Sequence, residues 1–445
     1  MRVAQMGISP SVGLLLVAGL LLAALSLAIL VSGPKSDAPS RDRLGSTSTS
    51  AEINSSIAFW EERVTADPYD FVAHNKLAQS YLRRARETGD VADYTRAETA
   101  VTASLERSRG DNFVATALLA SIQNTKHQFG DAIVTARRAI AMDPGDPSGY
   151  AMLGDAQLAL GQYDEALENY ERIVTIGPGL TSFSRLAHVK ELLGDVVGAD
   201  LAWQNALSTD GGRMPENTAW AHAQYGDFHF RLGRLKDAEA SYEESLETVP
   251  GFVQALAGVA NVLAAEGDYA TAIDLYDTIV VRQPRPNYAA TLGDLYAAVG
   301  NNDAAARHYN LVLAIAALYQ ANGIDTDLET ALFLADHELN LHDAVRQARA
   351  IYARQPDSIY AADALAWTLH RNGQTEEAQE YVRQAIRLGT PDPMLHFHAG
   401  VVAKAAGELD EARQHLAKAS DLNPRFSVLH ADTLASALDG LPVSQ

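Results

Sequence analysis

Residues 147–179 decide the fold, and their sequence is PSGYAMLGDAQLALGQYDEALENYERIVTIGPG. The spacing of the apolar residues predicts two short amphipathic helices. Gly154 and Ala166 are small where the two helices must approach each other, and Tyr170 fills the space beside them. Pro178 ends the second helix. Because one such pair cannot bury its apolar faces alone, the pair must stack on copies of itself.

The small residue at the helix crossing recurs along the chain at intervals of 33, 34 or 39 residues. A Gly stands five residues before most of these positions, but His127 and Leu339 replace it in two repeats. The two intervals of 39 predict an extra loop near residues 211–217 and a lengthened second helix near residues 318–325. The nine crossing positions are Ala132, Ala166, Ala199, Ala238, Ala272, Ala305, Ala344, Ala378 and Ala412.

This pattern resembles the tetratricopeptide repeat family over roughly residues 71–426. The resemblance implies an all-α solenoid of about ten helix pairs, wound into a right-handed superhelix with a concave inner face. Residues 51–70 are expected to form a preceding helix, and residues 427–445 a capping helix and tail. Motifs such as YAADALAWTLHRNG and RLGTPDPMLHFHAG also resemble a group of uncharacterised bacterial proteins of this family, which implies no activity.

The N-terminal region contains twenty uncharged residues, 12–31, long enough to span a bilayer as one helix. A cleaved signal peptide and a buried soluble helix are the alternatives, although the run is longer than a usual signal core. Residues 32–50 are rich in Ser, Gly and Pro and predict a disordered linker. We therefore expect a membrane-anchored or secreted protein, with its bulk outside the cytoplasm.

The composition excludes several classes of function. The chain has no Cys, so disulfides and thiolate chemistry are excluded. A formal net charge of −21 makes nucleic acid a poor partner. The sequence carries no nucleophile elbow, phosphate-binding Gly-rich loop, dinucleotide fingerprint or zinc-protease motif. We expect a non-enzymatic protein with no cofactor, which binds a protein or peptide partner.

The family resemblance implies that the first helix of each pair lines the concave face. At one inward position, the middle repeats carry short polar side chains that could hydrogen-bond an extended peptide. A solvated inner wall that only keeps the solenoid soluble is the alternative. The predicted binding residues in this row are Asp155, His188, Asp227, Asn261 and Asp294.

Toward the C-terminus the predicted inner wall combines aromatic and charged side chains, as interaction hot spots do. Ordinary packing between repeats is the alternative, above all for Phe333 and Trp367. The predicted binding residues of this region are Glu329, Phe333, His337, Tyr360, Asp363, Trp367, His370, Arg371, Phe397 and His398.

The same region leaves a second hypothesis open, a His/Asp-dependent enzyme or a protein that handles divalent metal. The candidate metal ligands of this region are Asp336, His337, His342, Asp343, His396 and His398. His337 and His342 are five residues apart, and His396 and His398 are two apart. Neither pair shares a helix face as residues four apart would. We therefore expect no metal site, and the leading hypothesis is a protein interaction scaffold.

Overall fold

The computed structural model describes residues 50–441, except for residues 109, 210–213 and 325–326. Twenty-two helices and no strand occur in this part of the chain. Among these helices, none is both long and apolar enough to cross a membrane. The predicted membrane segment, residues 12–31, and the predicted linker, residues 32–50, lie outside the described residues apart from Ser50.

The helices form ten consecutive antiparallel pairs, preceded by α2 (Ser50–Ala66) and followed by α23 (Ala431–Asp439). The pairs are α3 (Phe71–Thr88) with α4 (Ala92–Arg107), α5 (Phe113–Thr125) with α6 (Phe129–Met142), α7 (Pro147–Ala159) with α8 (Tyr163–Ile176), α9 (Leu180–Leu192) with α10 (Val196–Thr209), α11 (Pro215–Arg231) with α12 (Leu235–Thr248), α13 (Val253–Glu266) with α14 (Tyr269–Arg282), α15 (Pro286–Ala298) with α16 (Asn302–Ala321), α17 (Asp327–Asp336) with α18 (Leu341–Arg354), α19 (Ile359–Arg371) with α20 (Thr375–Ala385), and α21 (Pro393–Ala406) with α22 (Leu409–Leu422).

Small residues allow the two helices of each pair to nest. All nine crossing alanines are at most 2% exposed, which confirms their predicted place in the core. Gly154 lies against the ring of Tyr170, and a Cβ atom at Gly154 would come within 2.6 Å of that ring. Gly at this position is therefore a packing requirement, because any larger side chain would push the helices apart.

The turns inside the pairs use a left-handed backbone conformation, which usually requires Gly. Gly161, between α7 and α8, has a φ of 83°. Where Gly is missing, His127 takes this conformation itself, with a φ of 57°. In the other exceptional repeat, Glu338 and Asn340 take it, on either side of Leu339. The turn at His127 therefore keeps the geometry of the repeat, whereas the turn at Leu339 uses two left-handed residues and is one residue longer than the turn at Gly161.

The two longer repeat intervals have different structural causes. Helix α16 has 20 residues, whereas most second helices have 14, so the predicted lengthening is confirmed. The loop predicted near residues 211–217 is wrong for residues 215–217, which form the start of α11. Pro at the first turn suits a helix start, because its missing N–H has no partner to lose there. Residues 210–213 lie outside the described part.

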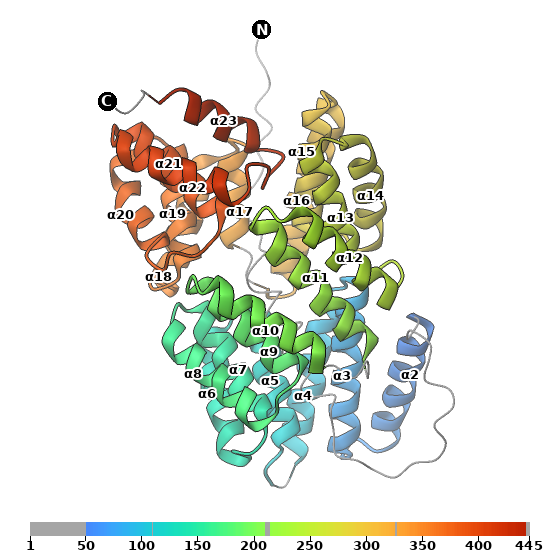
Figure 1. The fold of residues 1–445 in the computed structure, drawn as a ribbon. Coiled ribbons are helices and arrows are strands. Elements are labelled where there is room, and N and C mark those ends of the chain that lie inside the picture. The colour runs from blue at the N-terminus through green and yellow to red at the C-terminus, as the bar shows by residue number, and fades with distance from the viewer. Residues whose placement is uncertain (1–49, 109, 210–213, 325–326, 442–445) are drawn as a thin grey trace.

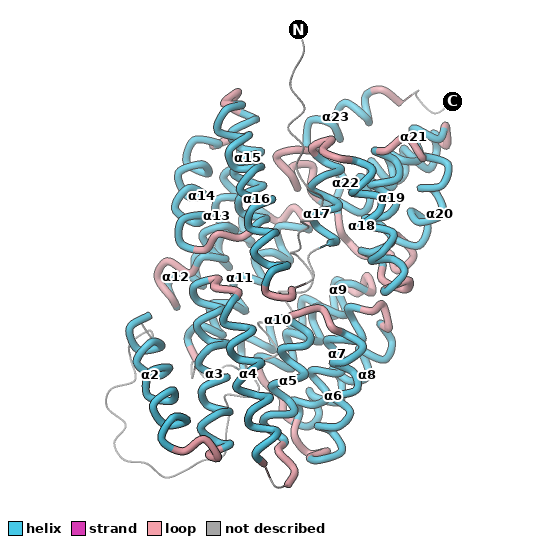
Figure 2. Tube along the Cα trace, turned by 180° about the vertical axis from the view of Figure 1, so that it is seen from behind, coloured by secondary structure: helices cyan, strands magenta, loops and turns pink. Residues whose placement is uncertain are grey.

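The solenoid winds so tightly that successive turns of the superhelix touch (Figures 1 and 2). Hydrogen bonds join residues about 196 positions apart in the sequence. Each bond links the turn between the two helices of one pair to the loop that follows a later pair, five pairs further along the chain. We call this row of contacts the seam. Its bonds run from Gln283 Nε2 to Glu87 O (2.6 Å), Ile359 N to Tyr163 Oη (2.9 Å), Thr390 Oγ1 to Leu192 O (2.6 Å) and Asn423 Nδ2 to Phe230 O (2.7 Å).

The seam sets the dimensions of the superhelix. Each interhelix turn contacts a segment of the chain that lies almost six pairs further on. About six pairs therefore complete one turn of the superhelix. The last six pairs, α11 to α22, therefore form a nearly closed ring above the first pairs (Figure 1). Their first helices face the centre of this ring.

Candidate functional site

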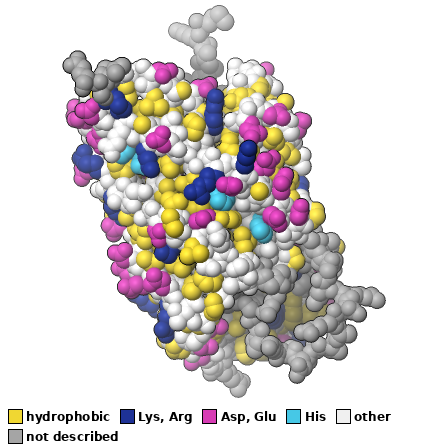
Figure 3. Space-filling view, viewed as in Figure 1, with side chains coloured by type: hydrophobic (Ala, Val, Ile, Leu, Met, Phe, Trp, Pro, Cys, Tyr) yellow, Lys and Arg dark blue, Asp and Glu magenta, His cyan; other side chains and the backbone are white. Residues whose placement is uncertain are grey.

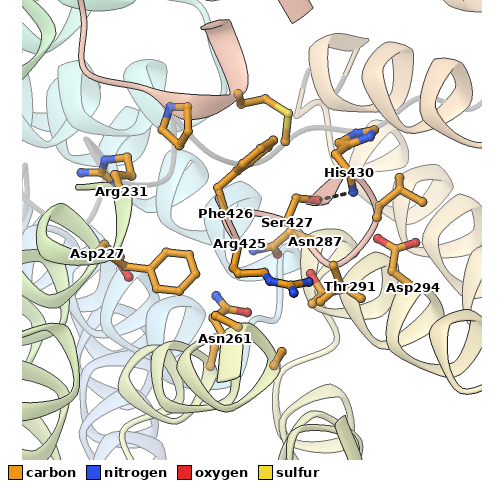
Figure 4. A pocket seen from close by; sticks show the side chains of 18 of the residues that line it. Asp227, Arg231, Asn261, Asn287, Thr291, Asp294, Arg425, Phe426, Ser427 and His430 are labelled. Carbon is orange, nitrogen blue, oxygen red and sulfur yellow. Dashed lines mark hydrogen bonds between the residues drawn. The ribbon is translucent and has the colours of Figure 1, made fainter. Parts of the chain in front are cut away.

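A cavity of about 540 Å³ lies at the centre of this ring. Its wall contains residues from all six first helices, α11, α13, α15, α17, α19 and α21. Residues 425–431, which connect α22 to α23, also line it. Figure 4 shows Arg425 and Phe426 of this segment between Asp227 and Asn261 on one side and Asp294 on the other. We call this space the inner cavity.

Five of the predicted binding residues line the inner cavity. They include members of the polar row of the middle repeats and of the C-terminal group, so residues of both groups line the same cavity. The remaining predicted residues are not among its lining side chains. Whether any of them binds a partner stays a prediction. The five that line the cavity are Asp227, Asn261, Asp294, Tyr360 and Asp363.

The polar row along the first helices is held by tyrosines of the second helices. Each Tyr donates its hydroxyl to the Asp or Asn that stands 15 residues earlier in the same pair. These side chains therefore have a structural partner inside the repeat. Asp227, Asn261 and Asp294, which line the inner cavity, can still accept further hydrogen bonds there. The bonds join Tyr170 to Asp155 (2.9 Å), Tyr242 to Asp227 (2.8 Å), Tyr276 to Asn261 (2.7 Å) and Tyr309 to Asp294 (2.9 Å).

Burial changes the ionisation of this row. Burial raises the pKa of Asp227 to about 6, against the lowering effects of the Arg231 charge and of the hydrogen bond from Tyr242. Burial also lowers the pKa of His188. Asp155 instead forms a fully buried ion pair with Arg185, whose Nε lies 2.8 Å from Asp155 Oδ1. The row therefore mixes a paired carboxylate, a carboxyl that titrates near neutral pH and neutral groups.

Three of the predicted hot-spot aromatics belong to the core. Phe333, Trp367 and Phe397 are at most 5% exposed, and none of them lines the inner cavity. Trp367 donates its Nε1 hydrogen to Asp336 Oδ1 at 2.7 Å. The packing interpretation accounts for the burial of these rings, and their role in binding remains untested.

His337 and Arg371 of the C-terminal group both contact side chains of the inner helices. His337 Nε2 lies 2.8 Å from Asp294 Oδ1. Burial alone would lower the pKa of His337. The hydrogen bond to Asp294, the charges of Asp294 and Asp336 and the Phe333 carbonyl together outweigh burial and raise this pKa. Arg371 lies over the Trp367 ring at 5.2 Å, and burial lowers the pKa of its neighbour His370 to about 4.

Glu329 is a carboxyl without a hydrogen bond. Neither of its carboxylate oxygens has a hydrogen-bond partner within the described residues. Burial raises the pKa of Glu329 well above its usual value. Burial therefore favours the neutral form of this side chain.

The segment before α23 is the part of the site that sequence reasoning missed. The sequence predicts a capping helix and tail over residues 427–445, but the helix begins only at Ala431. Residues 425–430 turn into the inner cavity instead. Asn423-Pro424 before them marks the end of the last repeat, but no pattern in the sequence shows where the following segment goes.

One group of side chains in this region has the donor atoms of a metal site. Asp336 of α17, His398 of α21 and His430 of the segment before α23 each offer one donor atom, and these atoms lie within 4.8 Å of one another. His398 and His430 are 1% and 5% exposed. His430 was not among the residues considered for a metal site from the sequence.

The helix pairs, their packing residues and the superhelical winding define an α-solenoid. Family models agree over most of the chain: a tetratricopeptide repeat model matches residues 125–186, and another matches residues 364–425. A third model, the middle TPR-like domain of cilia and flagella-associated protein 70, matches residues 183–340. The chain belongs to the tetratricopeptide repeat family.

Among curated proteins, the chain is similar to the TPR repeat-containing protein PA4667 of Pseudomonas aeruginosa. The two are 29% identical over 208 residues, which cover 45% of this chain and 35% of that protein. The cellulose synthase operon protein C of Pseudomonas fluorescens is 28% identical over 31% of this chain and 11% of its own length. The chain thus spans about a third or less of the length of these relatives.

Solved structures show the same kind of similarity at low identity. Human IFIT1 is 14% identical, with 90% of this chain and 94% of that chain covered and a TM-score of 0.47. The protein TTC0263 of Thermus thermophilus, a thermophilic TPR protein, is 22% identical over 42% of this chain and 99% of its own, with a TM-score of 0.37.

The face of the molecule seen in Figure 3 is mixed in charge. Figure 3 shows acidic side chains gathered along both edges of one face, with Lys and Arg between them. Several basic groups are paired, as in the contacts of Arg231 with Glu191 at 2.6 Å and of Arg349 with Glu377 at 2.6 Å.

Proposed function

We propose that this protein is a non-enzymatic scaffold that holds a short extended segment of a partner protein in the inner cavity. The tetratricopeptide repeat fold suggests protein interaction in general, and the inner cavity is the observation that supports this finer proposal. Its volume of about 540 Å³ suits a few residues of extended chain and is too small for a folded domain.

The side chains of the wall suit a peptide backbone. A peptide presents alternating N–H donors and C=O acceptors, so its site needs acceptors and donors together. Asp227, Asp294 and Asp363 supply acceptors, and Arg285 and Arg425 supply donors. The wall also has an unused polar atom, because Asn287 Oδ1 is buried and has no hydrogen-bond partner within the described residues. A bound N–H group would satisfy it.

Position-specific photo-cross-linking in the native cells tests this proposal. A photoreactive residue in place of Thr291 would face the inner cavity from α15, whereas one in place of Glu243 would face solvent from α12. We expect the Thr291 probe to cross-link one short segment of a partner, identified by mass spectrometry, and the Glu243 probe not to do so. No cross-link at Thr291, or the same products from both positions, would rule the proposal out.

We also propose that residues 12–31 tether the protein to a membrane and that residues 32–50 let the repeats move away from it. The support is the sequence alone: twenty uncharged residues followed by a Ser-, Gly- and Pro-rich stretch. With the repeats outside the cytoplasm, an added protease should digest them in intact cells. Protection until the cells are lysed would contradict the outward placement.

A further inference from the structure

We propose that Asp336, His398 and His430 form a binding site for one divalent zinc ion at the edge of the inner cavity. The three residues come from separate segments of the last pairs, α17, α21 and the loop before α23. Two imidazoles and one carboxylate are a donor set that Zn²⁺ prefers, and three protein ligands leave one coordination position open. Asp336 and His430 both line the inner cavity, so the site lies at its wall.

The donor atoms already lie close together, within 4.8 Å of one another. His430 Nε2 lies 3.2 Å from Asp336 Oδ1. The rings of His398 and His430 are nearly perpendicular, with an interplanar angle of 82° and centroids 6.1 Å apart. Small movements of the side chains would bring all three donor atoms to the 2.0 to 2.2 Å or so that zinc–nitrogen and zinc–oxygen bonds need.

His398 carries the second, independent observation. Its side chain is almost completely buried, yet its Nε2 atom has no hydrogen-bond partner within the described residues. A buried polar atom without a partner costs stability, so its presence calls for a ligand. A metal ion uses the lone pair of Nε2.

The surrounding side chains fix the orientation of the ligands. Nδ1 of His398 lies 3.0 Å from Asp363 Oδ2, so the Asp363 carboxylate holds the proton on Nδ1 and leaves Nε2 available for an ion. Trp367 Nε1 donates to Asp336 Oδ1 at 2.7 Å and holds that carboxylate in place. The carboxylates of Asp336 and Asp363 together balance the charge of a divalent ion.

Such an ion would connect the C-terminal segment to the ring of repeats. His430 belongs to the segment that turns into the inner cavity, whereas Asp336 and His398 belong to inner helices. Zinc would therefore hold residues 425–431 against α17 and α21, and it would place a Lewis acid at the wall of the cavity. This site does not depend on the peptide-binding proposal.

Zinc titration of the full-length chain tests the site. The protein, carrying no histidine tag, is treated with a chelator, dialysed and titrated with Zn²⁺ by isothermal calorimetry at neutral pH. We expect saturation at one ion per chain. His398→Gln and His430→Gln should each weaken binding at least tenfold, and Asp363→Asn should weaken it about 10- to 100-fold.

His396→Gln is the matched control. His396 lies on the same helix and is also buried, but its Nδ1 faces Nδ1 of His415 at 3.1 Å. This variant should bind zinc as the unaltered chain does. An absence of saturable binding at one equivalent would overturn the proposal. Equal affinity of the unaltered chain and the His398 and His430 variants would do so too.

A measurement on the unaltered chain covers the case in which a variant fails to fold. Cobalt(II) in a site with two imidazoles, one carboxylate and a fourth ligand gives strong visible absorption bands, unlike the hydrated ion. We expect these bands to reach their maximum at one equivalent and to disappear when zinc is added. Only the weak spectrum of hydrated cobalt would rule the site out.

Discussion

At the scale of single residues, Tyr242 shows how one side chain connects two repeats. Its ring lies between Gly226 of its own pair and Gly258 of the next pair, and a Cβ atom at either glycine would come within 2.5 Å of the ring. Its hydroxyl donates to Asp227. The glycines and the tyrosine are all visible in the sequence pattern, so this contact could be predicted from the repeat itself.

Gly226→Ala should lower the free energy of unfolding by about 1 to 3 kcal/mol, because the added methyl group overlaps the Tyr242 ring. Ala has a higher helix propensity than Gly by about 1 kcal/mol. If helix propensity alone set the result, the substitution would therefore raise the free energy of unfolding. Urea unfolding followed by circular dichroism measures the difference. Gly130→Ala in α6 is the control, since no atom lies within 4 Å of its added Cβ, and it should leave stability unchanged or slightly higher.

At the scale of helices and turns, the sequence predicts which residues form the helix pairs. It predicts the conformation of the turns between the helices less well. The positions of the helices follow from local spacing, and the lengthened α16 follows from one irregular interval. The turns without Gly were harder to predict. Leu339 stands where most repeats have Gly, and the left-handed conformation is taken by its neighbours Glu338 and Asn340 instead. Asn tolerates this conformation better than most residues.

The C-terminal element shows the limit of reasoning from repeats. An end helix was predicted, and α23 is present, with Leu434 buried in the core. The six residues before α23 no longer follow the repeat pattern, so their path into the inner cavity had no periodic signal to predict it. For the same reason His430 could not be connected with Asp336 and His398 from the sequence, because these residues lie in three separate segments.

At the scale of the whole molecule, the seam closes the solenoid. Helix pairs and a concave face could be predicted from the sequence, because they depend on contacts between neighbouring repeats. The seam could not, because its contacts join residues about 196 positions apart and depend on small rotations summed over six pairs. The inner cavity exists because of this winding: the first helices of six pairs surround one space rather than line an open groove.

The most direct test of this account is a cross-linking measurement across the seam. The chain has no Cys, so Gln162→Cys with Asp357→Cys introduces two unique thiols, one on each side of the seam. The neighbouring Gly161 lies so close that its added Cβ would be 2.1 Å from the Asp357 backbone. Gln128→Cys with Asp357→Cys is the matched control, because Gln128 occupies the same turn one pair earlier.

A short bifunctional maleimide, with the products read by mass spectrometry, should link the first Cys pair within one chain and leave the control pair unlinked. That result would confirm that turns of the superhelix meet in the register described. An unlinked first pair, or equal linking of both pairs, would contradict the closed ring and the inner cavity that depends on it.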